Sequence, residues 1–208
     1  MKMKRIAAVL IFALFALSLL AQDGLKVEYK GDRPTISDFA SAIVASSLVD
    51  EDDEECEVDE SSNAFNQAWL RYSQGLPQEE GNTLTVDQRN GFVLYESVFE
   101  ESKLRVEMCF WNEADQAHKI IAYNVSCFMD DEYSPGQFDG LVFYRYDNAS
   151  KTMTWVDAPG FEVEYGTEDG AWVCYDLPRT GKDITVNYWK DGGKKQKILK
   201  WNGSQFNK

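Results

Sequence analysis

Residues 84–97 read LTVDQRNGFVLYES, and this stretch decides the fold because it predicts a β-hairpin. Apolar and polar residues alternate on both sides of Asn90-Gly91, which is the period of a half-buried strand. An Asn-Gly pair is the strongest short hairpin signal, since both central positions of a tight hairpin turn favour positive φ. We therefore expect two antiparallel strands that meet at Asn90-Gly91.

The same alternation continues toward the C-terminus, with turn signals at short intervals. Further strands are expected in LKVEYK (25–30), LRVEMCFW (104–111), KIIAYNVSCF (119–128), LVFYRY (141–146), TMTWV (152–156), FEVEY (161–165), ITVNYW (184–189) and KQKILKW (195–201). Consecutive hairpins build an antiparallel sheet, and about eight to ten strands curl strongly. The region of about 83–206 therefore predicts a large, mostly antiparallel, strongly curved sheet, arranged as a meander, barrel-like sheet or sandwich.

Two helices are expected before the sheet, at about 35–48 and 61–74. The first has an apolar stripe with helical spacing that includes Ile36, Phe39 and Ile43, and Thr35 with Asp38 forms a capping-box start. The second ends at Gly75, a residue that favours the conformation after a helix C-terminus. Both helices need a surface on which to pack, so the fold class is α+β, with two N-terminal helices on the sheet.

Residues 1–21 are predicted to be a signal peptide. Lys2, Lys4 and Arg5 precede an apolar run from Ile6 to Leu20, and Ala21 offers a small residue for cleavage. The alternative is a membrane anchor, but this run is shorter than the roughly 20 residues that cross a bilayer. No cysteine follows the run to accept a lipid. We expect an exported product, periplasmic, outer-surface or extracellular, with a single domain at 22–208 and no transmembrane anchor after cleavage.

The chain is acidic, and its charge is unevenly placed. Without residues 1–21, which carry three basic residues and no acidic one, 18 basic and 35 acidic residues leave a net charge of −17. Such a protein repels nucleic acid and anionic membranes. Nine of the eleven residues at 50–60 are acidic, which predicts a solvated loop between the two helices.

Cys56, Cys109, Cys127 and Cys174 leave the disulfide state open. An oxidising compartment permits bridges, whereas the position of Cys127 on an apolar strand face favours a buried thiol. No two cysteines are close in sequence, and the acidic run lacks the glycine and the final glutamate of an EF-hand. We therefore expect no metal and no cofactor.

The sequence favours a binding protein over an enzyme, and no catalytic residue is assigned. His118 is the only histidine, and no nucleophile motif accompanies it. A carboxylate-dependent glycan hydrolase is the alternative, because Glu162 and Glu164 alternate along an expected strand and would lie roughly 7 Å apart on one face.

Aromatic residues suggest where a ligand would bind. If Asp147 pairs with Lys151, then Phe143 and Met153 face the core, whereas Tyr144 and Tyr146 lie on the outer face of the hairpin. We therefore take Tyr144 and Tyr146 as candidate ligand-binding residues for stacking on carbohydrate.

Three segments carry a resemblance to known proteins: RPTISDFASA (33–42), FDGLVFYRYDNASKTMTW (138–155) and PRTGKDITVNYWKDGGKKQKILKWNGSQF (178–206). Together they resemble an uncharacterised secreted protein family of gut and oral Bacteroidetes. The resemblance implies export from a Gram-negative cell, and it brings no activity, cofactor or site residue.

The preferred hypothesis is therefore a secreted or periplasmic, non-enzymatic binding protein for an envelope glycan or protein. A third hypothesis, after the hydrolase, is an acidic inhibitor or decoy of a cationic protein such as lysozyme, based on the net charge of −17.

Overall fold

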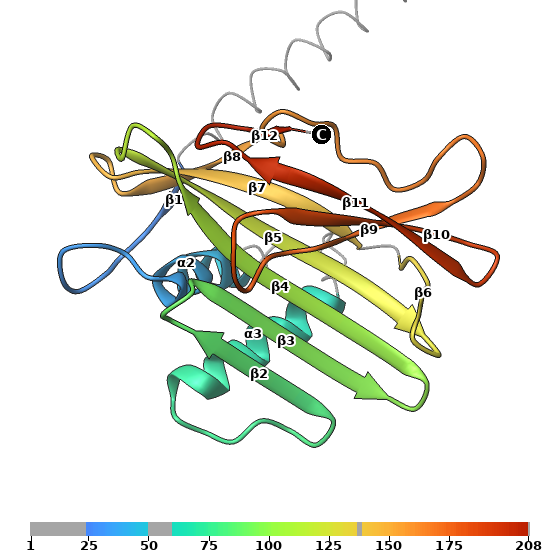
Figure 1. The fold of residues 1–208 in the computed structure, drawn as a ribbon. Coiled ribbons are helices and arrows are strands. Elements are labelled where there is room, and N and C mark those ends of the chain that lie inside the picture. The colour runs from blue at the N-terminus through green and yellow to red at the C-terminus, as the bar shows by residue number, and fades with distance from the viewer. Residues whose placement is uncertain (1–23, 50–59, 137–138, 208) are drawn as a thin grey trace, which may run out of the picture.

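The computed structural model describes residues 24–49, 60–136 and 139–207. Its fold is α+β, with two helices on a large antiparallel sheet that curls strongly into a half-barrel, so the predicted fold class is confirmed (Figure 1). The predicted leader, most of the predicted acidic loop and Cys56 lie outside the described residues.

The strands form two sheets in which all neighbouring strands run antiparallel. The large sheet has the order β1-β8-β7-β5-β4-β3-β2, with β6 paired to β5, and the small sheet has the order β12-β11-β10-β9. The helices are α2 (Ile36–Val49) and α3 (Glu60–Ser73). The strands are β1 (Leu25–Lys26), β2 (Asn82–Asp87), β3 (Phe92–Phe99), β4 (Ser102–Asn112), β5 (His118–Met129), β6 (Glu132–Tyr133), β7 (Gly140–Asp147), β8 (Thr152–Val156), β9 (Trp172–Asp176), β10 (Ile184–Lys190), β11 (Gly193–Trp201) and β12 (Phe206–Asn207).

The large sheet is the middle layer, with the helices on one face and the small sheet on the other (Figure 1). Alternation along β4 shows why both faces are covered. Val106 and Met108 pack in the core with the helices, whereas Cys109 and Trp111 pack in the core with the small sheet. A strand with buried side chains on both faces needs a covering layer on each side.

Both helices have the predicted ends. The Thr35 backbone N–H and hydroxyl each donate to Asp38 Oδ2 at 2.7 Å, which satisfies donors that a helix start leaves free. At the end of α3, Gly75 has a φ of 69° and the Leu76 N–H donates to the Arg71 carbonyl oxygen at 2.9 Å. These local bonds explain why the helix limits could be predicted from sequence.

The predicted hairpins form, but their turns differ in length. Asp87 lies opposite Phe92, so four residues connect β2 to β3, and Gly91 alone among them has positive φ, at 65°. The predicted two-residue turn at Asn90-Gly91 is therefore wrong. A two-residue connection occurs instead between β10 and β11, where Asp191 and Gly192 have φ values of 51° and 70°, as a type I′ turn requires.

No helix among the described residues combines the length and the apolar character needed to cross a membrane.

Candidate functional site

The best candidate site is a groove between strands β7 and β8 and the connection that follows β8. Its volume is about 380 Å³, within the range of small-molecule sites. The residues that line it are Leu141, Val142, Phe143, Trp155, Val156, Asp157, Ala158, Phe161, Glu162, Val163 and Tyr165. The connection between β8 and β9 thus supplies more than half of the residues that line the groove.

Phe161 anchors that connection to the interior between the two sheets. Its ring meets Phe143 edge-to-face, with the ring centroids 5.9 Å apart, and it meets Phe206 at 5.8 Å. Next to it, the Phe206 N–H donates to the Pro159 carbonyl oxygen at 2.8 Å. Edge-to-face aromatic pairs contribute about 0.5 to 1.5 kcal/mol beyond burial, so this irregular segment has a defined position.

A second attachment holds the far end of the connection. The Tyr175 hydroxyl accepts a hydrogen bond from the Glu164 N–H at 2.8 Å and donates to the Glu164 carbonyl oxygen at 3.0 Å. Tyr175 is itself buried in the core between the sheets. The groove wall is therefore fixed at both Phe161 and Glu164, and its shape exists before any ligand arrives.

Two aromatic side chains of the groove are open to solvent. Trp155 is 65% exposed and Tyr165 is 50% exposed, whereas most large apolar side chains of a monomer are buried. Asp157 and Glu162 add exposed carboxyl groups, and none of the described lysine, arginine or histidine residues lines the groove. The site thus combines stacking surfaces with hydrogen-bond acceptors.

Tyr144 and Tyr146 lie elsewhere, and their predicted place on an outer face is wrong. Tyr146 is fully buried and its ring packs on Phe39 of α2 at 5.2 Å, and Tyr144 packs against the same core. Tyr146 lies opposite Met153, whereas the predicted pairing of Asp147 with Lys151 set Arg145 there. A shift of one residue moves a whole strand to the other face.

Trp155 is also exposed against expectation, and the register alone does not account for its exposure, because the alternation places Trp155 on the strand face of the buried Met153. The predicted pairing placed Trp155 opposite Phe143 in the core, but in the structure Trp155 lies opposite Tyr144. The threonines on either side of Trp155 were the one sequence signal of a partly exposed strand. In the structure, β1 pairs with β8 only at Thr152 and Met153, so Trp155 lies beyond the residues that β1 covers.

Glu162 and Glu164 do not share a strand face, because residues 161–165 form no strand. Both side chains are exposed, and Glu162 lines the groove whereas Glu164 does not. The spacing argument for a hydrolase pair therefore has no basis in this segment, and hydrolysis by these two residues stays a prediction.

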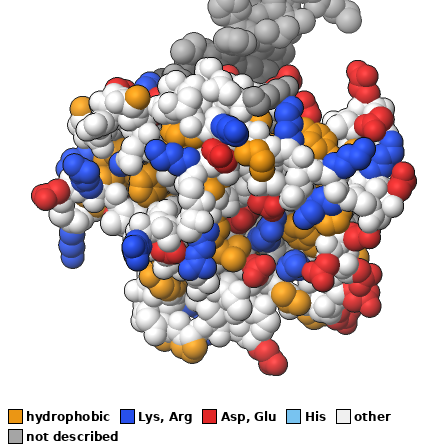
Figure 2. Space-filling model, viewed as in Figure 1, with side chains coloured by type: hydrophobic (Ala, Val, Ile, Leu, Met, Phe, Trp, Pro, Cys, Tyr) orange, Lys and Arg blue, Asp and Glu red, His pale blue; other side chains and the backbone are white. Residues whose placement is uncertain are grey.

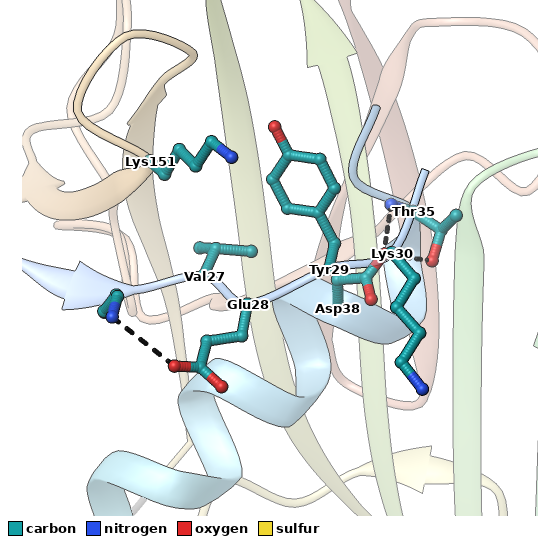
Figure 3. Close-up of a pocket in the computed structure, with 8 residues that line it drawn as sticks. Val27, Glu28, Tyr29, Lys30, Thr35, Asp38 and Lys151 are labelled. Atoms are coloured by element: carbon teal, nitrogen blue, oxygen red, sulfur yellow. Dashed lines mark hydrogen bonds and ion pairs between the residues drawn. The ribbon is translucent and has the colours of Figure 1, made fainter. Parts of the chain in front are cut away.

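A second and more open pocket, of about 760 Å³, lies beside β1 (Figure 3). Lys26 and Glu28 form an ion pair at 3.5 Å, and Asp38 is engaged by Thr35. Lys30 and Lys151 add positive charge, with the Lys151 ammonium 4.9 Å from the centre of the Tyr29 ring. Because positive and negative side chains are mixed in this pocket, we expect it to discriminate less between anionic and cationic ligands than the groove does.

A buried polar cluster links β4 and β5 to the small sheet. The Asn124 amide donates to Glu107 Oε2 at 3.1 Å and to the Tyr175 carbonyl oxygen at 2.8 Å. Arg105 Nη2 donates to Asp176 Oδ1 at 2.6 Å, and its Nε lies 3.8 Å from Glu107 Oε2. Burial raises the pKa of the Glu107 carboxyl to about 7, although Arg105 lowers it.

One group of side chains has the donor types of a metal site. Glu113, Asp115 and His118 bring possible ligand atoms within 4.8 Å of one another at the turn between β4 and β5. However, Arg145 Nε already donates to Glu113 Oε2 at 2.7 Å, and His118 Nδ1 lies 2.6 Å from Asp115 Oδ2. The Arg145 guanidinium thus supplies the positive charge that a metal ion would bring to Glu113, and the cluster is an ion-pair network.

The cysteines offer little nucleophilic chemistry. Cys109 and Cys174 are buried thiols, and burial raises the pKa of Cys174 to about 11 and that of Cys109 well above its usual range. A reactive cysteine needs the opposite shift, toward the thiolate. Cys127 is half-buried in β5, on the strand face that also carries Ile121 and Val125.

Comparison with known protein families, with curated proteins and with solved structures found no significant match to this chain. The resemblance to Bacteroidetes secreted proteins therefore stays a prediction.

Proposed function

We propose that this chain is a non-enzymatic glycan-binding protein and that the groove at β7 and β8 is its binding site. The observation that carries the proposal is the pair of exposed aromatic side chains, Trp155 and Tyr165, on the rim of a preformed groove with the apolar Phe161 beside them.

The chemistry of the groove suits a sugar. Pyranose rings present apolar C–H faces that stack on indole and phenol rings, and hydroxyl groups that donate to carboxylates such as Asp157 and Glu162. Binding sites generally join an apolar surface to a few polar groups that fix orientation, and Trp and Tyr provide large contact areas with a polar handle.

The proposal also fits the predicted location of the protein. Residues 1–21 predict export, and the resemblance predicts a Gram-negative envelope. Glycans are abundant there. The absence of a nucleophile motif in the sequence supports binding without turnover.

Titration with tetrasaccharides of glucose, xylose, glucosamine and N-acetylglucosamine tests the proposal, with calorimetry for every variant and tryptophan fluorescence for those that keep Trp155. We expect at least one to bind, and Trp155→Ala to weaken its affinity by about tenfold or more, the size typical of a buried aromatic anchor. Trp172→Ala is the matched control, because Trp172 is 53% exposed but does not line the groove.

Two results would contradict the proposal. No binding of any tetrasaccharide at millimolar concentration would favour a protein partner, and equal loss in both tryptophan variants would point away from the groove. Product analysis of the same mixtures separates binding from hydrolysis. Cleavage that Glu162→Gln abolishes would instead support the hydrolase alternative.

A second candidate function is binding of a cationic protein, favoured by what we call the acidic tip. It consists of Val98–Glu101, the end of β3 with its turn to β4, and Met129–Asp131, the end of β5 with its turn to β6. Phe99 is 72% exposed and Met129 is 45% exposed. Acidic side chains gather at this end of the molecule (Figure 2). The Asp130 N–H donates to the Glu101 carbonyl oxygen at 3.0 Å, which joins the two turns.

Binding of purified lysozyme, measured by calorimetry, tests this second function. We expect Phe99→Ala to weaken binding, with Ile198→Ala as the control, since Ile198 is also exposed but lies on β11. Affinity should fall between about 0.01 M and 1 M salt, because the Debye length falls from about 30 Å to about 3 Å. Absent or salt-independent binding would contradict this function.

A further inference from the structure

We infer that the groove selects sugars that carry a free ammonium group, such as unacetylated hexosamines. This inference rests on the proposed glycan binding and names the class of glycan. It follows from the charge of the groove and from the arrangement of its aromatic rings.

The charge of the groove has one sign. Asp157 and Glu162 line it, and no basic residue of the part of the chain that the structure describes does so. Among the described residues, neither carboxylate forms an ion pair or a hydrogen bond with a lysine or arginine, unlike Asp87, which pairs with Arg179 at 2.9 Å. Two uncompensated carboxylates beside a ligand attract a cation and repel an anion.

The aromatic rings strengthen the same preference. An ammonium group is attracted to the face of a tryptophan or tyrosine ring within about 6 Å of its centre, by about 0.5 to 1 kcal/mol at exposed sites. Trp155 and Tyr165 present such rings on the rim of the groove that holds Asp157 and Glu162. Aromatic rings are a recurrent means of holding ammonium ligands, and the carboxylates of the groove add a charge of opposite sign.

The pocket beside β1 is the internal contrast. Its lining holds charges of both signs, because Glu28 and Asp38 lie among the lysines and Glu28 forms an ion pair with Lys26 at 3.5 Å. The charged residues described in the groove are carboxylates alone. The ammonium preference is therefore a property of the groove and not of the surface in general.

The test compares two tetrasaccharides of equal length, one of glucosamine and one of N-acetylglucosamine. We expect the glucosamine tetramer to bind about five- to tenfold more tightly at low salt, because Asp157 and Glu162 can each form one exposed ion pair with an ammonium group. The preference should shrink at about 1 M salt.

The variant Asp157→Asn/Glu162→Gln should remove the preference while it keeps the aromatic rings. Glu164→Gln is the matched control, because Glu164 is an exposed acid two residues away that does not line the groove. Trp155→Phe keeps a stacking ring and should keep the preference.

Each result has a distinct meaning. Equal affinity for both tetramers, lost in Trp155→Ala, would overturn the ammonium preference and leave the proposed glycan binding intact. A preference that survives the double amide variant would also overturn the inference. Failure of both tetramers, together with failure of the neutral sugars, would overturn glycan binding itself.

Discussion

The two faces of the large sheet are covered in chemically different ways. On the helix face, Phe39 and Phe65 pack against Tyr146 and Tyr95 with ring centroids 5.2 Å and 6.0 Å apart. On the other face, the small sheet covers an apolar core that borders the polar cluster around Glu107. The first interface depends on shape and apolar area, whereas the second also depends on the protonation of a carboxyl group.

This difference has consequences for stability. Of the described residues, Glu107 is the one carboxyl that is buried, at 5% exposure. Replacing water around a carboxylate by protein is costly unless hydrogen bonds and a counter-ion compensate, and here Asn124 and Arg105 do so in part. The helix face should therefore be insensitive to pH, and the small-sheet face should not.

The largest expected effect removes the centre of the helix face. Phe39 is fully buried and contacts both Tyr146 and Phe110, so Phe39→Ala should lower the free energy of unfolding by about 3 to 5 kcal/mol. Urea denaturation measures the change. Gln67→Ala, at an exposed position of α3, should change stability by less than about 0.5 kcal/mol. A loss below about 1 kcal/mol for Phe39→Ala would contradict this description of the core.

The second prediction concerns pH and the small-sheet face. The Glu107 pKa is raised from 4.5 to about 7 in the folded protein, so the folded state binds more protons. The stability that this group contributes is present below pH 4.5 and is lost as the pH rises through 7.

Glu107→Gln removes that loss. Compared with the parent protein, the variant should show little difference in stability near pH 4.5 and be more stable by up to about 3 kcal/mol near pH 8. Denaturation curves at several pH values measure the difference, and Glu168→Gln, at an exposed position, is the control. A variant that is less stable than the parent at all pH values would contradict this prediction. It would show that the ion pair of Glu107 with Arg105 stabilises the folded protein by more than burial of the carboxylate costs.

The smallest expected effect on stability concerns the close contact between Gly160, in the connection that lines the groove, and Phe206 of the small sheet. Gly160 has a φ of 85°, and an added Cβ would lie 2.5 Å from the Phe206 carbonyl oxygen. Gly170 has a φ of 82° with nothing within 4 Å of the same position. Gly160→Ala should therefore destabilise the protein by about 1 to 3 kcal/mol, and Gly170→Ala by about 1 kcal/mol.

The two glycine variants also test the groove. Only Gly160→Ala should weaken binding of the tetrasaccharides, because it displaces the segment that carries Phe161. Thermal unfolding and the fluorescence titration together measure both effects. Equal destabilisation by the two substitutions would mean that the close approach to Phe206 does not constrain the segment.

Local patterns predicted the elements well, and they failed where pairing was decided at a distance. The capping box at Thr35 and Asp38 and the glycine end of α3 act through bonds within a few residues. The β7–β8 register depends on where the turn closes, and an error of one residue placed Tyr146 on the face opposite to Met153, whereas the two residues are paired and buried in one core. The exposure of Trp155 depends on a distant segment as well, because β1 pairs with β8 only at Thr152 and Met153. The groove therefore borders the predicted hairpin, but more than half of its lining comes from the connection after β8, and Trp155 was expected in the core.

By itself, the sequence determined the α+β class, the two helices and the antiparallel hairpins, because periodicity and caps depend on neighbours in the chain. Only the tertiary structure decided that the last four strands form a separate sheet, that Glu107 is buried between layers, and that Phe161 carries the groove wall into the core. Burial and register arise from contacts between distant segments, and these contacts exist only when the whole chain has closed.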